Sequence, residues 1–361
     1  MKLKLIIVVI FYASILYGQQ ELWPVQTKAG YGLINKNGVL MVNPSYSYIS
    51  EFRDGLAYFK DSVGNGFMDF KGDVVFRTDY LVNYFSENLA SIMLNGHTYF
   101  IDKKGKIVIK PRFNNYIVGC TTSCFSRFSE GLAPLVITDN KQDGWYNFIY
   151  INKFGRVVFN RSYKYAQNFS EGLAFVKFND DKCGYINKVG QLVISLNSDQ
   201  SGFEFSEGYA LIYDDSFNSY YYIDNKGHIL GNLTFKNADS FSGGMAKVTF
   251  DKNWPQKWGY INTKGEVIVD PQFINCTKFS NDLACVRILE NSYDGHLNVN
   301  TFIINKLGEV VFGPFQNTVI QEYKNGLAFG IKTLSNDCNE NFFINLKGII
   351  IRRDTICSCD Y

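Results

Sequence analysis

One short pattern recurs about nine times along the 361 residues, and this recurrence constrains the fold more than any single residue does. Each copy has an apolar residue, then Asn or Asp, then Gly three residues further on. Successive copies lie about 36 residues apart, with a longer gap between the third and the fourth. The Asn or Asp positions are Asn35, Asp69, Asp102, Asn152, Asn187, Asp224, Asn262, Asn305 and Asn345. The spacing predicts small units that stack on copies of themselves.

The residues around this pattern predict a β-hairpin in each unit. In the clearest copy, Tyr260 and Ile261 precede Asn262, and the β-branched run Val267–Val269 follows Gly265. Asn and Asp fold their side chains onto nearby backbone, and Gly accepts a positive φ, so the intervening residues suit a short hairpin loop. Calcium binding is disfavoured, because only three of the nine positions are Asp and each loop has few other oxygen ligands.

A second element lies about 17 to 30 residues after the first and predicts a tight turn entering a strand. Its clearest copies are Phe-Ser-Glu-Gly-Leu-Ala at 128–133 and 169–174. The residue before Leu is usually Gly, which tolerates the left-handed region. The Ala that ends this stretch is retained in all eight copies of the second element. We therefore expect a crowded site beside the aromatic residue that begins the stretch, here called the turn aromatic. The acids Glu130, Glu171 and Glu207 recur with the array, so we interpret them as turn residues and not as a catalytic carboxylate pair.

Together these elements predict an all-β tandem repeat array of about nine three-stranded antiparallel units. Proline after the last strand of several units, as at Pro111 and Pro271, ends that strand. No regular fourth strand is evident, and propeller blades usually have four. We therefore expect an open β-solenoid-like stack, with a closed propeller-like ring as the alternative.

The repeats resemble the WG (tryptophan-glycine) β-repeat family. The resemblance is carried by Trp258-Gly259-Tyr260-Ile261-Asn262, by Gly265, Pro271 and Phe273, and by the stretch 169–174. It covers nearly everything after residue 21, although the Trp-Gly pair itself appears once and the copies have diverged. The resemblance implies a repeat scaffold without defined catalytic residues.

The N-terminus predicts export. Lys2 and Lys4 precede a 14-residue apolar run from Leu5 to Gly18, which is typical of a secretory signal peptide and short for a membrane anchor. We expect residues 1–18 to be the signal peptide and residues 19–361 the repeat domain, in a secreted, periplasmic or cell-surface protein. Removal of Lys2 and Lys4 leaves equal numbers of basic and acidic residues. A neutral chain without a basic stripe disfavours nucleic acid as a partner.

Eight cysteines in an exported chain permit disulfides. Cys120 and Cys124 share one inserted loop and form the best local pair. Cys338 could pair with Cys357 or with Cys359 and tie down the C-terminal end. Cys183 and Cys285 occupy repeat positions that are apolar elsewhere and suit free core thiols. The spacing of Cys and His does not suit zinc, and no cofactor is expected.

No catalytic motif is present, so we expect function in the residues that do not repeat. These are the insertions 113–125, 196–203, 288–300 and 332–341. Tyr220–Tyr222 could form a stacking platform for sugars, although cross-strand packing is favoured. We predict a non-catalytic scaffold that binds a protein or glycan at the envelope or outside the cell. A structural or adhesive protein is the alternative. A hydrolase is disfavoured, since its candidate acids Asp294, Asp337 and Glu340 are divided between two different insertions.

Overall fold

A computed structural model of the chain describes residues 21–95, 97–110, 126–138, 146–252, 255–291, 297–335 and 337–357. These residues form nine small antiparallel sheets that follow one another along the chain. The expected signal peptide, residues 1–18, lies outside the described residues. The all-β repeat architecture is therefore confirmed.

The first four sheets run from residue 23 to residue 152 and contain thirteen strands. The first sheet contains β1 (Trp23–Thr27), β2 (Gly30–Ile34) and β3 (Leu40–Tyr46). The second contains β4 (Tyr48–Ile49), β5 (Ala57–Lys60), β6 (Asn65–Met68) and β7 (Val74–Arg77). The third contains β8 (Leu81–Val82), β9 (Leu89–Leu94), β10 (His97–Asp102) and β11 (Ile107–Ile109). The fourth contains β12 (Leu132–Thr138) and β13 (Tyr146–Asn152).

The remaining five sheets continue the same order of strands. The fifth contains β14 (Tyr165–Ala166), β15 (Leu173–Lys177), β16 (Cys183–Asn187) and β17 (Leu192–Leu196), and the sixth β18 (Gln200–Gly202), β19 (Tyr209–Asp214) and β20 (Ser219–Asp224). The seventh contains β21 (Asn237–Ala238), β22 (Met245–Thr249), β23 (Trp258–Asn262) and β24 (Val267–Phe273). The eighth contains β25 (Asn275–Cys276), β26 (Leu283–Asn291), β27 (Leu297–Asn305) and β28 (Val310–Gln316). The ninth contains β29 (Thr318–Ile320), β30 (Leu327–Ser335), β31 (Cys338–Asn345) and β32 (Ile350–Cys357).

The prediction of three strands per unit is wrong for most of the array. Six of the nine sheets have four strands, and the additional strand is a segment of two or three residues before the turn. In the seventh sheet this strand is β21, which pairs with the end of β22 through Ala238 and Val248. Segments this short carry no hydrophobic period, so the sequence pattern does not reveal them.

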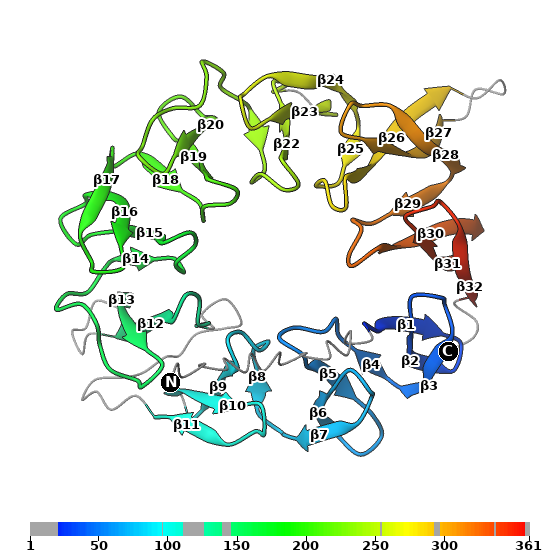
Figure 1. Cartoon of the computed structure of the whole chain (residues 1–361), viewed down its shortest axis with the longest axis horizontal. Helices are drawn as coiled ribbons and strands as arrows, with labels where there is room; N and C mark the ends of the chain where they lie inside the picture. Colours follow the sequence, from blue (N-terminus) through cyan, green and yellow to red (C-terminus); the bar gives the residue numbers. More distant parts are fainter. Residues whose placement is uncertain are drawn as a thin grey trace, which may run out of the picture.

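The prediction of an open stack is also wrong, because the sheets close into a propeller-like ring (Figure 1). Val25 and Ile34 of the first sheet share one apolar cluster with Leu327 and Phe343 of the ninth. The indole N–H of Trp23 also donates to the carbonyl of Lys324 at 3.2 Å. The last sheet thus covers the apolar face that the first sheet would otherwise expose, and the array needs no capping unit.

The hairpin predicted at each Asn/Asp-x-x-Gly is confirmed. In the seventh sheet, Asn262 Oδ1 accepts the backbone N–H groups of Lys264 and Glu266 at 2.9 and 3.0 Å. Gly265 has a φ of 79° and donates to the carbonyl of Asn262. The other eight copies repeat both side-chain bonds, so this oxygen serves the loop backbone in every unit.

The second repeated element is a two-residue turn that joins the first and second strands of a unit. Ser170 and Leu173 exchange backbone hydrogen bonds, and the two residues between them both have positive φ, 54° at Glu171 and 82° at Gly172. Two successive positive φ angles are the geometry of a type I′ turn. The left-handed conformation expected at the Gly position is therefore confirmed, and it extends to the acidic residue before it.

The retained Ala lies at the packed interface between neighbouring sheets. Ala174 is 1 % exposed and belongs to one cluster with Phe169 of its own turn and with Leu132 and Tyr150 of the preceding sheet. The equivalent alanines are all buried: Ala57, Ala90, Ala133, Ala210, Ala246, Ala284 and Ala328. The expected crowding beside the turn aromatic is confirmed.

The Gly of the Trp-Gly pair is required by close backbone approach. A Cβ atom on Gly259 would lie 2.3 Å from the carbonyl oxygen of Val269 and 2.7 Å from the nitrogen of Pro271. Both atoms belong to β24, whose pairing with β23 shifts register at this point. Only a residue without a side chain allows the two strands to meet there.

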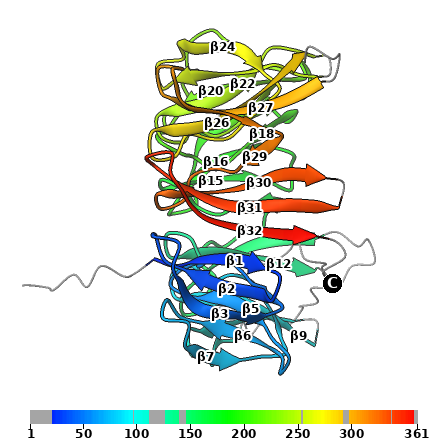
Figure 2. The same cartoon turned by 90° about the vertical axis from the view of Figure 1, so that its right-hand side faces the viewer.

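The antiparallel strand order separates two faces of the ring. The two-residue turns connect the first strand of a sheet to the second, and the Asn/Asp-x-x-Gly hairpins connect the third to the fourth. Both kinds of connection therefore lie on the same face. The connections between strands two and three, and between successive sheets, lie on the opposite face. The insertions 196–203, 288–300 and 332–341 belong to these connections, and β30 and β31 extend toward the right-hand side of Figure 2. The fourth insertion, 113–125, lies outside the described residues.

Candidate functional site

One position in the repeat holds a different residue in most copies, and it lies on the inner side of the ring. It is the residue just before the turn aromatic: Glu51, Tyr84, Arg127, Asn168, Glu204, Ser240, Lys278 and Glu322. Arg127 precedes the fourth sheet's turn and Glu204 the sixth sheet's turn, yet the two side chains meet across the fifth sheet. Such a contact is feasible only on the concave side of a ring. We call these eight residues the inner-wall positions.

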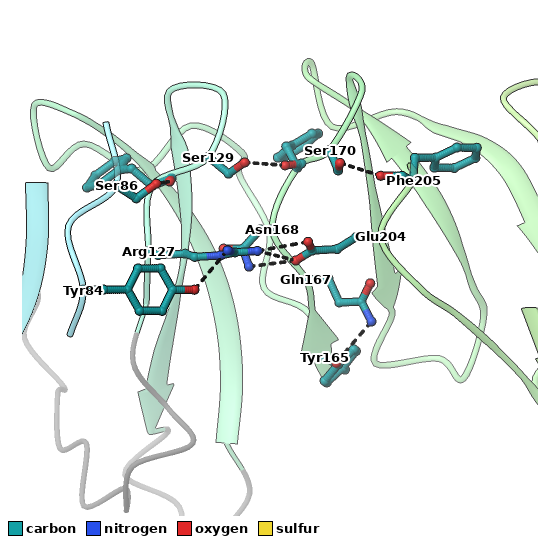
Figure 3. A network of polar contacts seen from close by, with 12 residues as sticks. Tyr84, Ser86, Arg127, Ser129, Tyr165, Gln167, Asn168, Ser170, Glu204 and Phe205 are labelled. Carbon is teal, nitrogen blue, oxygen red and sulfur yellow. Dashed lines mark hydrogen bonds and ion pairs between the residues drawn. The ribbon is translucent and has the colours of Figure 1, made fainter. Parts of the chain in front are cut away.

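Arg127 is the centre of the polar network drawn in Figure 3. Its Nη2 donates to both carboxylate oxygens of Glu204 at 3.0 Å, and its Nη1 donates to the hydroxyl of Tyr84 at 3.0 Å. Asn168 Nδ2 donates to the same carboxylate at 3.0 Å. Burial alone would lower the pKa of Arg127, but Glu204 and Tyr84 outweigh burial and raise it. The network therefore links four consecutive sheets around an ion pair between the fourth and the sixth.

An open groove adjoins this network. One part of about 450 Å³ is lined by Ser126, Asn168, Glu204 and Ser240 among others, and a second part of about 600 Å³ continues from it. Both parts are lined by Val136, Phe148, Tyr165, Gln167 and Phe203. Tyr165 and Phe203 keep 41 % and 40 % of their surface exposed. A mainly apolar groove with a few fixed polar groups is the usual form of a binding site.

Two amide oxygens in the groove have no hydrogen-bond partner among the described residues. Gln167 donates from Nε2 to the carbonyl of Gly202 at 3.0 Å, but its Oε1 is buried and accepts nothing. Asn168 Oδ1 is also buried and accepts no hydrogen bond, although Nδ2 of the same side chain donates to Glu204. A buried acceptor without a donor costs about 1–3 kcal/mol. These two oxygens therefore remain unsatisfied behind the wall of the groove.

The repeated acids and serines bind the neighbouring sheet. Ser170 Oγ donates to the carbonyl of Phe205 at 2.7 Å, and Glu130 accepts the N–H of Gly172 at 3.1 Å and pairs with Lys188 at 2.9 Å. Four further serines make the equivalent bond: Ser86, Ser129, Ser206 and Ser242. Four further acids make the equivalent contact to the next turn: Asp54, Glu87, Glu171 and Glu207. These side chains join consecutive units, as their interpretation as turn residues requires.

Two of the three acids proposed for a hydrolase lie in one hairpin. Glu340 lies on β31 and pairs with Arg353 of the neighbouring β32, and Asp337 lies in the same hairpin. Asp294 lies outside the described residues. A sugar-stacking platform made by all three of Tyr220–Tyr222 is not formed, because Tyr222 is 1 % exposed and its hydroxyl donates to the carbonyl of Asp239 at 2.6 Å.

Three of the five cysteines singled out for disulfides lie outside the described residues: Cys120, Cys124 and Cys359. Cys338 and Cys357 are joined by a disulfide between β31 and β32. Cys183, Cys276 and Cys285 are buried free thiols. In the described part of the chain, no group of His, Cys, Asp and Glu is arranged to hold a metal ion. That part also contains no helix of the length and apolarity that crossing a bilayer requires.

The fold and the inner wall define a closed β-propeller built from diverged repeats. The sequence profile described as "WG containing repeat" matches residues 31–61, 100–141, 150–183, 184–215, 222–254 and 258–291, more than half of the chain. The chain therefore belongs to this WG repeat family. None of the curated proteins matches the sequence.

Several solved structures resemble the ring at low similarity. BamB from Moraxella catarrhalis is 10% identical over 91% of this chain and 92% of that one, with a TM-score of 0.38. Hsv2 from Kluyveromyces lactis is 13% identical over 80% and 94%, with a TM-score of 0.37. Prolyl oligopeptidase B from Galerina marginata is 10% identical over 94% and 52%, with a TM-score of 0.39. Similarity at this level carries no information about a ligand or a reaction.

The inner wall was missed by sequence reasoning, which placed function in the insertions. A signal was present: the residue before the turn aromatic changes in nearly every copy, while the positions after it are retained. Variation at one register in a repeat array is typical of a ligand-facing position. The register alone, however, does not show that the position faces the centre of a ring.

Proposed function

We propose that this protein is an exported, non-catalytic scaffold that binds a macromolecular ligand, a protein or a glycan, in the groove beside Arg127. The observation that carries the proposal is the groove itself. Consecutive sheets contribute non-repeated polar groups to it, and Tyr165 and Phe203 expose apolar rings beside them. Export is supported by the N-terminal basic and apolar residues, which are typical of a signal peptide.

The groove chemistry suits binding better than catalysis. Glu204 is the one carboxylate among the described residues that line the groove, and it accepts hydrogen bonds from Arg127 and Asn168. A general acid or base requires a carboxylate free to exchange a proton with substrate, whereas both oxygens of Glu204 already accept bonds from Arg127. The exposed rings supply contact area at low cost in conformational entropy, as binding surfaces commonly do.

The proposal is tested by binding to peptide and glycan arrays with matched variants. Phe203→Ala removes a groove ring, and we expect affinity to fall about tenfold or more, as for a central interface aromatic. Phe154→Ala is the control, because Phe154 is 84 % exposed in the hairpin between Asn152 and Gly155 and lines neither part of the groove. Binding by the wild-type protein that survives Phe203→Ala unchanged would contradict the groove. No binding to either array would favour the structural alternative.

A further inference from the structure

A second pocket lies where the ring closes, apart from the groove beside Arg127. It has a volume of about 360 Å³ and is formed by the first, second and ninth sheets. Its rings include Trp23, Tyr31 and Tyr48, and its charged groups are Glu51, Glu322 and Lys324. Glu51 and Glu322 are inner-wall positions, and Figure 1 shows β1 beside the ninth sheet at this point. We call it the closure pocket.

The aromatic rings of the closure pocket lie at an angle to one another. Tyr31 and Tyr48 have centroids 5.6 Å apart and planes inclined at 58°. Trp23 lines the same pocket, fixed by its indole N–H bond to the carbonyl of Lys324. Tyr48 remains 45 % exposed. A cation that enters beside such rings is attracted, because an aromatic ring carries negative potential on its face.

The charges of the closure pocket favour the same kind of ligand. Glu51 pairs with the ammonium of Lys324 at 2.6 Å. Glu322 is half-buried, and no described residue forms a hydrogen bond or ion pair with it. The next cation, Lys278, lies outside the pocket lining and shares the carboxylate of Asp239 with Lys247, each at 3.3 Å. The residues that line the pocket therefore include two carboxylates and one ammonium, and Glu322 is the carboxylate without a paired cation in the described part of the chain.

Because Glu322 has no paired cation among the described residues, the charged form of its carboxyl group is poorly stabilised. Burial raises the pKa of its carboxyl group above the usual value, and the more distant Lys278 and Lys324 only partly oppose this. A carboxylate withdrawn from water is stabilised when a cation enters beside it. A neutral sugar would contact the same rings but would leave the charge uncompensated.

We propose that the closure pocket binds an organic cation, the ammonium or guanidinium group of a lysine- or arginine-type side chain. The rings contact the alkyl stem and the charged head, and Glu322 pairs with the head. Lys324 already places one ammonium in the pocket, on Glu51. This site is independent of the groove beside Arg127, so either proposal can fail without the other.

The test is isothermal titration of the full chain with N-acetyl-lysine amide and N-acetyl-arginine amide. The neutral isostere N-acetyl-norleucine amide is the ligand control. We expect the charged probes to bind at least tenfold more tightly than the neutral one. A lysine-containing tripeptide, run beside free cadaverine, distinguishes a peptide side chain from a free amine as the source of the cation.

Two variants address the pocket and one serves as the control. Glu322→Gln removes the charge, and Tyr48→Leu removes a ring while retaining apolar volume; each should weaken the charged probes about tenfold. Glu309→Gln changes an acid in the exposed hairpin of the eighth sheet and should leave binding unchanged. Equal binding of charged and neutral probes would overturn the proposal. So would charged-probe binding that survives both pocket variants, or glucose binding in place of the cations.

Discussion

Removal of the Glu130 carboxylate should destabilise the ring measurably, because Glu130 joins two consecutive units. Its oxygens accept the N–H of Gly172 at 3.1 Å, and Lys188 lies 2.9 Å away. The bond from a backbone N–H to a charged acceptor contributes about 1.5–3 kcal/mol. The partly exposed ion pair adds about 0.2–1 kcal/mol. Glu130→Ala should therefore lower the free energy of unfolding by about 2 kcal/mol.

Glu130→Gln separates these two contributions. Its amide oxygen still accepts the N–H of Gly172 but no longer pairs with Lys188, so we expect a loss of about 1 kcal/mol at neutral pH. Burial raises the pKa of Glu130, but Lys188 and the backbone bonds outweigh it, and the pKa lies below its usual value of 4.5. A lowered folded-state pKa stabilises the protein above pH 4.5, and this stabilisation is lost as the pH falls through the folded value.

Urea unfolding at pH 7 and at acid pH, followed by fluorescence and circular dichroism, measures both effects. The difference between wild type and Glu130→Gln should shrink toward zero below the folded pKa, since glutamine does not titrate. Glu266→Gln is the matched control: that carboxylate bonds to Asn262 within its own hairpin at 2.7 Å, and its loss should cost under about 0.5 kcal/mol. A Glu130→Ala cost no larger than that of the control would refute the reasoning, as would a Glu130→Gln difference that persists at acid pH.

Three further predictions test the core and the cysteines. Ala174→Val should lower the free energy of unfolding by about 1–3 kcal/mol by overpacking the interface between sheets, and an unchanged urea midpoint would contradict it. Reduction of the Cys338–Cys357 disulfide, which closes a separation of 19 residues, should cost about 3 kcal/mol, seen as a lower thermal midpoint that the double Ser variant reproduces without reductant. Burial raises the pKa of Cys276 to about 11 and of Cys285 to about 12, so both thiols should resist alkylation at pH 8 until the chain unfolds. Site-resolved mass spectrometry would detect the opposite result, rapid labelling of the native protein.

The local structure was predictable because each repeated residue acts on backbone close to it. Asn262 and Gly265 close a hairpin whose residues are adjacent in sequence. Gly172 takes a positive φ inside a two-residue turn, and Ala174 meets the aromatic of the same turn. A residue that serves neighbours within its own unit is visible in one sequence, since the requirement returns with every copy.

The candidate site was not predictable, because its residues meet across units. Arg127 and Glu204 are 77 residues apart and contact each other over an intervening sheet. Short inner strands such as β21, with two residues, carry no period that would have indicated a fourth strand. The insertions were recognisable as departures from the repeat, but the concave position of the residue before the turn aromatic was not.

The sequence by itself determined the repeating unit: its hairpin, its turn, its buried alanine and its family. Only the tertiary structure decided that the units close on themselves. Whether a stack remains open or forms a ring depends on a small rotation between neighbouring sheets, which is summed over the whole array. That summed rotation brings Val25 against Phe343, and it also directs the variable positions toward one another, which creates the groove and the closure pocket.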